Sequence, residues 1–118
     1  MNNILYTKKI KMTPELQKKL DDLIHQYKVM LFMKGSPDMP MCGFSAQAVE
    51  MLIDNGIYFE SFDIYSDEEV RQGLKEYKDW PTYPQLYVNG ELIGGLDIMV
   101  EMQEAGEFED IKKQVGME

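Results

Sequence analysis

The chain of 118 residues has the length of one domain, and its 44% hydrophobic and 28% charged residues exclude a disordered protein. No apolar stretch approaches the roughly 20 residues of a membrane helix, and a net charge of −9 disfavours nucleic acid and anionic membranes as partners. The single cysteine excludes an internal disulfide framework and favours a reducing compartment.

The first 33 residues are predicted to contain a leader, a helix and a strand. Residues 1–12 lack both the apolar core of a signal peptide and the bias of a transit peptide, so we interpret them as a flexible leader before one domain over residues 13–118. Thr13 as the cap and Pro14 at the first helical position predict a helix over 13–27. Its apolar positions are Leu16, Leu20, Leu23, Ile24 and Tyr27. The apolar run 29–33 is typical of a strand buried on both faces.

The middle of the chain is predicted to fold as a helix, a strand and a second helix. The helix over 43–56 carries an apolar side made of Phe44, Ala48, Val49, Leu52 and Ile53. The segment 57–64, rich in aromatic and β-branched residues, predicts a strand. The segment 66–80 opens with Ser66 and acidic residues, which a helix N-terminus favours.

The last third begins with an ordered turn, "WPTYPQ", which carries two prolines. "QLYVNGELIGG" then predicts a hairpin around its Asn-Gly pair, and helices are expected over 97–106 and 109–115. The order αβαβαββαα predicts an α/β fold with a four-stranded mixed sheet flanked by helices on both faces.

Cys42 directly precedes a predicted helix, where free N–H groups and the helix dipole lower a thiol pKa. A reactive thiolate is therefore expected, and the alternative is an inert buried cysteine. Ser45 occupies the position where a dithiol enzyme has its resolving cysteine, which excludes that mechanism. The only histidine, His25, is expected on the first helix, as a surface or packing residue and not as the base of a cysteine protease.

Four motifs in order, "KGSPDMPMCGFSAQAV", "EEVRQGLKEY", "WPTYPQLYV" and "NGELIGGLDI", resemble the monothiol CGFS-type glutaredoxins over about residues 14 to 114. The resemblance implies a thioredoxin fold. "TYPQLYV" and "GGLD" look more like the cytosolic and nuclear multidomain (PICOT-type) branch than the mitochondrial branch, which implies a cytoplasmic, and also nuclear, location.

The resemblance assigns a glutathione pocket. Lys34 and Arg71 resemble the cations that face the glutathione carboxylates, although either residue alone would be read as a solvated charge. Tyr83 precedes Pro84, the family's cis-proline, whose exposed backbone would pair with the cysteinyl part of the tripeptide. The γ-glutamyl end would meet a helix N-terminus and the pair Leu96 and Asp97. Two cations, an anion and a helix N-terminus are complementary to a tripeptide with two carboxylates and one ammonium.

The family's function implies that Cys42 ligates iron. Family members bind glutathione and, as a homodimer, a bridging 2Fe-2S cluster that they pass to acceptor proteins; without the cluster a monomer is expected. A 2Fe-2S cluster is held by four thiolates, which two chains and two glutathione molecules could supply. This chain departs from many bacterial and mitochondrial members at Leu96, where they have a second cysteine, so a disulfide with that position is impossible here.

Two other functions stay open. The first is a monothiol oxidoreductase that reduces protein-glutathione mixed disulfides through Cys42. The loop "GSPDMP" resembles the family's inserted loop, which would displace the second glutathione, so weak or no oxidoreductase activity is expected. The second is a protein-interaction module that carries no cluster.

Overall fold

The computed structural model describes residues 11–117. The predicted flexible leader over residues 1–12 therefore lies almost entirely outside the described residues. Within them, Met12 is partly buried against the core beside the first helix.

A four-stranded mixed sheet forms the centre of the molecule, as predicted. Its strand order is β2-β1-β3-β4, in which β1 pairs with β2 in parallel and with β3 antiparallel, and β3 pairs with β4 antiparallel. The strands are β1 (Val29–Met33), β2 (Glu60–Asp63), β3 (Gln85–Val88) and β4 (Glu91–Gly94). The predicted Asn89-Gly90 turn joins β3 to β4, with φ values of 50° and 82° that suit these two residues.

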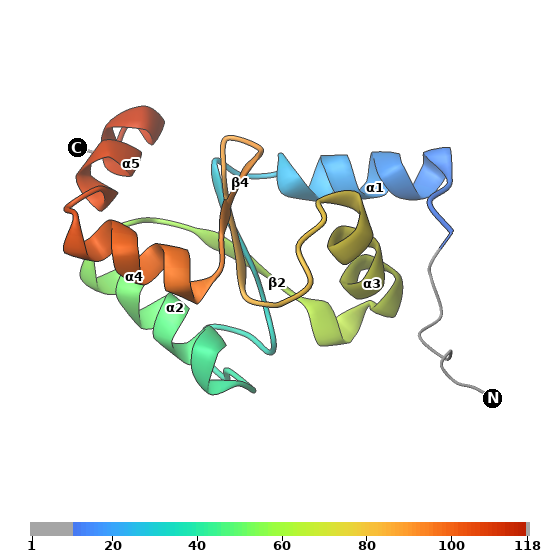
Figure 1. Cartoon of the computed structure of the whole chain (residues 1–118), viewed down its shortest axis with the longest axis horizontal. Coiled ribbons are helices and arrows are strands. Elements are labelled where there is room, and N and C mark those ends of the chain that lie inside the picture. The colour runs from blue at the N-terminus through green and yellow to red at the C-terminus, as the bar shows by residue number, and fades with distance from the viewer. Residues whose placement is uncertain (1–10, 118) are drawn as a thin grey trace.

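Helices cover both faces of the sheet (Figure 1). One face carries α1 (Pro14–Ile24) and α3 (Glu68–Tyr77); the other carries α2 (Gly43–Asp54), α4 (Leu96–Glu104) and α5 (Phe108–Val115). A 3-10 turn, η1 (Ile64–Ser66), leads from β2 to α3. None of the helices described between residues 11 and 117 is long and apolar enough to span a membrane.

The strand β1 separates two apolar cores because its side chains alternate between the faces. Leu31 and Met33 belong to the core under α2, α4 and α5, whereas Met30 and Phe32 belong to the core under α1 and α3. All five β1 residues are buried, as the apolar run predicted.

Three predicted core residues are exposed instead. Tyr27 lies beyond the end of α1 and is 48% exposed, because the helix ends at Ile24 and His25 is its C-cap. Phe44 and Ile53 on α2 are both 61% exposed; the buried face of α2 is formed by Ser45, Ala48, Val49 and Leu52. The helix therefore turns its small residues and Leu52 toward the sheet, and Phe44 outward.

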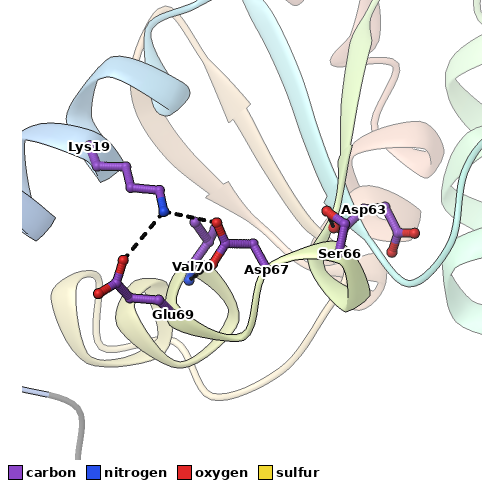
Figure 2. Close-up of polar contacts among 6 residues, drawn as sticks. All are labelled: Lys19, Asp63, Ser66, Asp67, Glu69 and Val70. Atoms are coloured by element: carbon purple, nitrogen blue, oxygen red, sulfur yellow. Dashed lines mark hydrogen bonds and ion pairs between the residues drawn. The ribbon is translucent and has the colours of Figure 1, made fainter.

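A charged contact ties α1 to the start of α3 (Figure 2). Lys19 Nζ lies 2.8 Å from Asp67 Oδ2 and 3.3 Å from Glu69 Oε1, while Asp67 Oδ1 accepts the N–H of Val70 and caps α3. The hydrogen bond with Lys19 lowers the pKa of the Asp67 carboxyl. Asp67, and not Ser66, is thus the cap of α3, whose second turn carries Arg71.

Candidate functional site

Cys42 is the N-cap of α2 and has an extended backbone, with φ −158° and ψ 135°. Its thiol is free and half-buried. The pKa of the thiol is lowered, chiefly by the backbone N–H of Ser45 and further by the N–H of Phe44 and the ammonium of Lys34, although burial opposes the shift. The thiol therefore ionises more readily than a free cysteine, a property that favours both nucleophilic attack and metal coordination.

The loop between β1 and Cys42 is closed by backbone hydrogen bonds. The Ser36 N–H donates to the Met39 carbonyl over 3.2 Å, and the Met39 N–H donates to the Ser36 carbonyl over 3.0 Å. The N–H of Met41 donates to the Lys34 carbonyl over 2.9 Å. Gly35 has φ +91°, and a Cβ there would lie 2.5 Å from the Met39 carbonyl oxygen. Only glycine fits this closure, so the tight loop fixes where Cys42 begins the helix.

Ser45 and Asp63 anchor the same loop to the rest of the fold. The buried Ser45 hydroxyl accepts the N–H of Lys34 over 3.1 Å and also lowers the Cys42 pKa. Asp63 Oδ1 accepts the N–H of Gly35 over 3.0 Å. In the sequence Ser45 was noted only as the missing second cysteine; in the structure its hydroxyl supports both the loop and the thiolate.

A cleft of about 410 Å³ opens beside the N-terminal ends of α2 and α4. It brings together five of the six predicted site residues: Lys34, Arg71, Tyr83, Leu96 and Asp97. Cys42 itself does not line the cleft, but Lys34 and Phe44, which act on its thiol, do. The cleft is formed by the residue that follows β1, the N-terminal ends of α2 and α4, residues of α3 and the segment that leads into β3.

A third cation, Lys75, lines this cleft and was missed in the sequence. Burial lowers the pKa of Lys75, and the positive charges of Arg71 and Lys34 lower it further. The signal that could have found it is the spacing of four residues from Arg71 on α3, which places both side chains on one helix face. Three cations thus give a basic pocket in an acidic protein.

Arg71 and Tyr83 are fixed to each other. The Tyr83 hydroxyl donates to the Arg71 carbonyl over 2.8 Å, and burial raises the pKa of Tyr83, so this donor stays protonated. The Arg71 guanidinium lies 3.3 Å from the Glu68 carboxylate through Nη1, and its Nε is buried with no hydrogen-bond partner among the described residues.

The segment before β3 turns at a cis peptide between Tyr83 and Pro84, in agreement with the resemblance. The fully buried Gln85 holds this segment: its Nε2 donates to the carbonyls of Trp80 and Thr82, 3.1 and 3.3 Å away. The Tyr87 hydroxyl donates to Gln85 Oε1 over 2.7 Å. Gln85 was missed as a site-shaping residue; a polar side chain that opens the apolar run "QLYV" was the available signal.

Two glycines allow α4 to begin at the wall of the cleft. A Cβ on Gly95 would lie 3.1 Å from the Pro84 carbonyl oxygen, and one on Gly94, where φ is +145°, would lie 2.6 Å from Ile98. Gly95 is the N-cap of α4 and Asp97 lies in its first turn. Free helix N–H groups and a carboxylate therefore stand together, a combination suited to a carboxylate and an ammonium on one ligand.

The described residues hold no group of three or more His, Cys, Asp or Glu side chains that could bind a metal ion. His25 does not line the cleft; it packs against Gly90 at the β3–β4 turn. Within residues 11–117, Cys42 is therefore not part of a group of three such side chains. A metal centre at Cys42 would need ligands from other molecules.

The fold and the site define a single-thiol protein of the thioredoxin class. The sequence model described as Glutaredoxin matches residues 29–93. An uncharacterized monothiol glutaredoxin of Synechocystis is 51% identical over 100 residues, which cover 85% of this chain and 94% of that protein. The chain belongs to the monothiol glutaredoxin family.

Further relatives agree with this assignment. Glutaredoxin 3 of Danio rerio is 57% identical over 105 residues, covering 88% of this chain and 32% of that protein, so the chain spans about a third of this relative's length. The solution structure of a reduced apo glutaredoxin of poplar shares 46% identity with a TM-score of 0.74, over 90% of this chain and 97% of that one.

Proposed function

We propose that the chain is a glutathione-dependent scaffold or carrier of 2Fe-2S clusters. In this proposal, two chains bind one bridging cluster through Cys42 and glutathione, and pass it to acceptor proteins. The observation that carries the proposal is a single activated thiol at a helix N-terminus beside a cleft with three cations.

The cleft supports glutathione as the ligand. Lys34, Arg71 and Lys75 offer positive charge to a carboxylate, and the start of α4 with Asp97 offers N–H donors and a negative charge. Glutathione carries two carboxylates and one ammonium joined by a short peptide, which fits this distribution of charge. The neighbouring Cys42 thiolate would then lie close to the glutathione sulfur.

The number of thiols supports a shared cluster. Four thiolates commonly hold a 2Fe-2S cluster, and each chain supplies one. Two copies of Cys42 and two glutathione thiolates complete the set, which implies a homodimer when loaded and a monomer otherwise. Because half of the ligands are small molecules, the cluster would be released more readily than from a site of four cysteines.

The surface near the thiol supports contact with another protein. Met39, Met41 and Phe44 are 73%, 64% and 61% exposed, and all lie within three residues of Cys42. Exposed large apolar side chains near a reactive group favour a docking face. The second copy and the acceptor would use this same face in turn, so that the loaded dimer must open to deliver its cargo.

The second candidate is a monothiol oxidoreductase, favoured by the lowered pKa of Cys42. The Cys42 thiolate would attack the glutathione sulfur of a protein-glutathione disulfide, releasing the protein thiolate and forming a Cys42-glutathione disulfide. A second glutathione thiolate would then attack that disulfide, yielding oxidised glutathione and free Cys42. Turnover at rates typical of dithiol relatives would favour this candidate.

The branch and the location are part of the proposal. The likeness to Glutaredoxin 3 of Danio rerio supports the multidomain PICOT-type branch, and a single thiol suits the reducing cytosol and nucleus. Microscopy of a fluorescent fusion in the source cells tests this: signal confined to mitochondria would contradict it.

Anaerobic reconstitution with iron, sulfide and glutathione tests the main function. The wild-type chain should acquire the visible absorbance of a 2Fe-2S cluster, whereas Cys42→Ser should stay colourless with an unchanged far-ultraviolet circular dichroism spectrum. The double variant Cys42→Ser with Ser61→Cys is the matched control, because its single thiol lies on β2, away from the helix N-terminus. Absorbance in that control equal to wild type would contradict a specific site at Cys42.

A further inference from the structure

Arg71 reaches the cleft from α3, but few contacts direct its guanidinium. Its side chain is 30% exposed, Nη1 has a single 3.3 Å contact with the mostly exposed Glu68, and the buried Nε has no hydrogen-bond partner among the described residues. An exposed ion pair of this kind contributes little to holding a long side chain. The ion pair with Glu68 therefore leaves a role for another group in orienting the guanidinium.

That group is the ring of Tyr65, a residue of η1 to which no role has been given so far. The Arg71 Cζ atom lies 5.6 Å from the Tyr65 ring centroid, which is within the range of a cation–π contact. An aromatic ring attracts a guanidinium over its face and leaves the N–H edges free for a carboxylate. Stacking on Tyr65 can therefore orient Arg71 without consuming its hydrogen-bond donors.

Tyr65 is itself held in place from the thiol side of the site. Asp63 Oδ1 accepts the backbone N–H of Tyr65 over 2.9 Å and that of Gly35, in the loop before Cys42, over 3.0 Å. The hydroxyl of Ser66 donates to the Asp63 carbonyl over 2.6 Å (Figure 2). One carboxylate oxygen thus fixes both the thiol loop and the backbone that carries the ring.

We propose that Tyr65 is a positioning residue that holds the Arg71 guanidinium by cation–π stacking and so sets the affinity of the cleft for the glutathione carboxylate. This inference rests on the proposed binding of glutathione. Tyr65 is half-exposed and does not line the cleft, yet in this proposal it takes part in ligand recognition.

The test compares glutathione affinity by titration calorimetry at low ionic strength in three variants. Tyr65→Leu removes the ring and should weaken binding about two- to fivefold, the factor that corresponds to a cation–π contact at an exposed site. Tyr65→Phe keeps the ring and should bind like wild type. Tyr58→Leu removes another exposed tyrosine, which does not line the cleft, and should also bind like wild type.

A double-mutant cycle separates positioning from a general structural effect. In an Arg71→Gln background, Tyr65→Leu should cause no further loss, because the residue acts through Arg71. The Nε–H resonance of Arg71 in ¹H–¹⁵N spectra should move in Tyr65→Leu and stay in Tyr65→Phe, with no ligand present.

The outcomes distinguish the two proposals. Failure of the wild-type chain to bind glutathione would overturn the proposed function and this inference together. Wild-type binding with an unchanged affinity in Tyr65→Leu would overturn the inference alone. An equal loss with and without Arg71 would do the same.

Discussion

The backbone N–H of Lys34 donates a hydrogen bond to the buried hydroxyl of Ser45, 3.1 Å away. This contact joins the end of β1 to the first turn of α2, and Cys42 lies between the two partners in the chain. The backbone N–H of Ser45 lowers the pKa of the Cys42 thiol most, and the Lys34 ammonium and the Ser45 hydroxyl add smaller effects in the same direction. Lys34 and Ser45 thus contribute both to the closure of the loop and to the reactivity of the thiol.

Ser45→Ala should therefore change both properties. We expect a free energy of unfolding lower by about 1 kcal/mol, because the Lys34 N–H loses its acceptor, and a higher pKa of Cys42, because a donor to the thiolate is lost. Denaturant titration and the thiolate absorbance near 240 nm measure the two effects. Ser61→Ala, on β2, is the control and should leave the thiol pKa unchanged. A thiol pKa in Ser45→Ala equal to wild type would contradict the assigned role.

The lowered pKa of Cys42 predicts a definite dependence of stability on pH. Because the folded-state pKa lies below the unfolded value, the ionised thiol stabilises the fold fully at a pH above the unfolded pKa, and this contribution is lost as pH falls through the folded pKa. The difference in unfolding free energy between wild type and Cys42→Ser should follow that course. The alkylation rate of Cys42 should reach its half-maximum at a lower pH than that of the thiol in the unfolded chain, and in Lys34→Gln at a higher pH than in wild type. Identical pH profiles of alkylation for wild type and Lys34→Gln would contradict an effect of the Lys34 ammonium on the Cys42 pKa.

Gly35→Ala should destabilise the protein by about 1–3 kcal/mol, because φ is +91° and the new Cβ would meet the backbone atoms of Met39 and Met41 at 2.5 and 2.8 Å. Gly43→Ala is the matched control, since a Cβ there meets nothing within 4 Å. Thermal unfolding of the two variants tests the contrast. If both variants had the wild-type midpoint, the closed loop described here would be wrong.

Gln85→Leu should loosen the segment that leads into β3. The Trp80 and Thr82 carbonyls lose their donor and the Tyr87 hydroxyl loses its acceptor, so we expect a loss of about 2 kcal/mol in the free energy of unfolding. Glutathione binding should weaken as well, because Trp80 and Thr82 line the cleft. The exposed Gln47→Leu on α2 serves as the control and should change neither quantity. If Gln85→Leu bound glutathione with wild-type affinity, the segment before β3 would have no role in binding.

Lys75→Gln should weaken glutathione binding several-fold at low ionic strength and less at high ionic strength, because a charge–charge attraction is lost. Lys113→Gln, an exposed substitution on α5 with the same change of charge, should have no effect. Calorimetric titrations at two salt concentrations make the comparison. Equal effects of the two substitutions would indicate that net charge, and not the cleft, governs binding.

Local sequence patterns predicted the elements of this fold well, because apolar runs, turn residues and helix caps each act through local chain preferences. The run 29–33, the Asn-Gly turn and the Thr13 cap all appear in the structure as expected. Helix ends and helix faces were less accurate. Tyr27 continues the helical period beyond the actual end at Ile24, and Phe44 is apolar yet points away from the core.

The candidate site likewise contains residues that the sequence predicted and residues that it did not. A family resemblance pointed to Lys34, Arg71, Tyr83, Leu96 and Asp97, and the fold brings them to one cleft. Lys75 and Gln85 were missed although each had a local signal, the spacing of four residues from Arg71 and a polar side chain at the start of an apolar run. Tyr65 was missed because its role depends on a side chain from another segment, which no local pattern reports. Ser45 was read only as a missing thiol, since its hydrogen bond to Lys34 spans a loop whose closure could not be inferred from the sequence.

The mass of the reconstituted protein under native, anaerobic conditions tests the central claim most directly. The account predicts a dimer whose mass exceeds that of two chains by one 2Fe-2S cluster and two glutathione molecules, and a monomer after the cluster is chelated. Cys42→Ser should stay monomeric under the same conditions. A wild-type chain that remains a colourless monomer, or a cluster bound without glutathione, would contradict it.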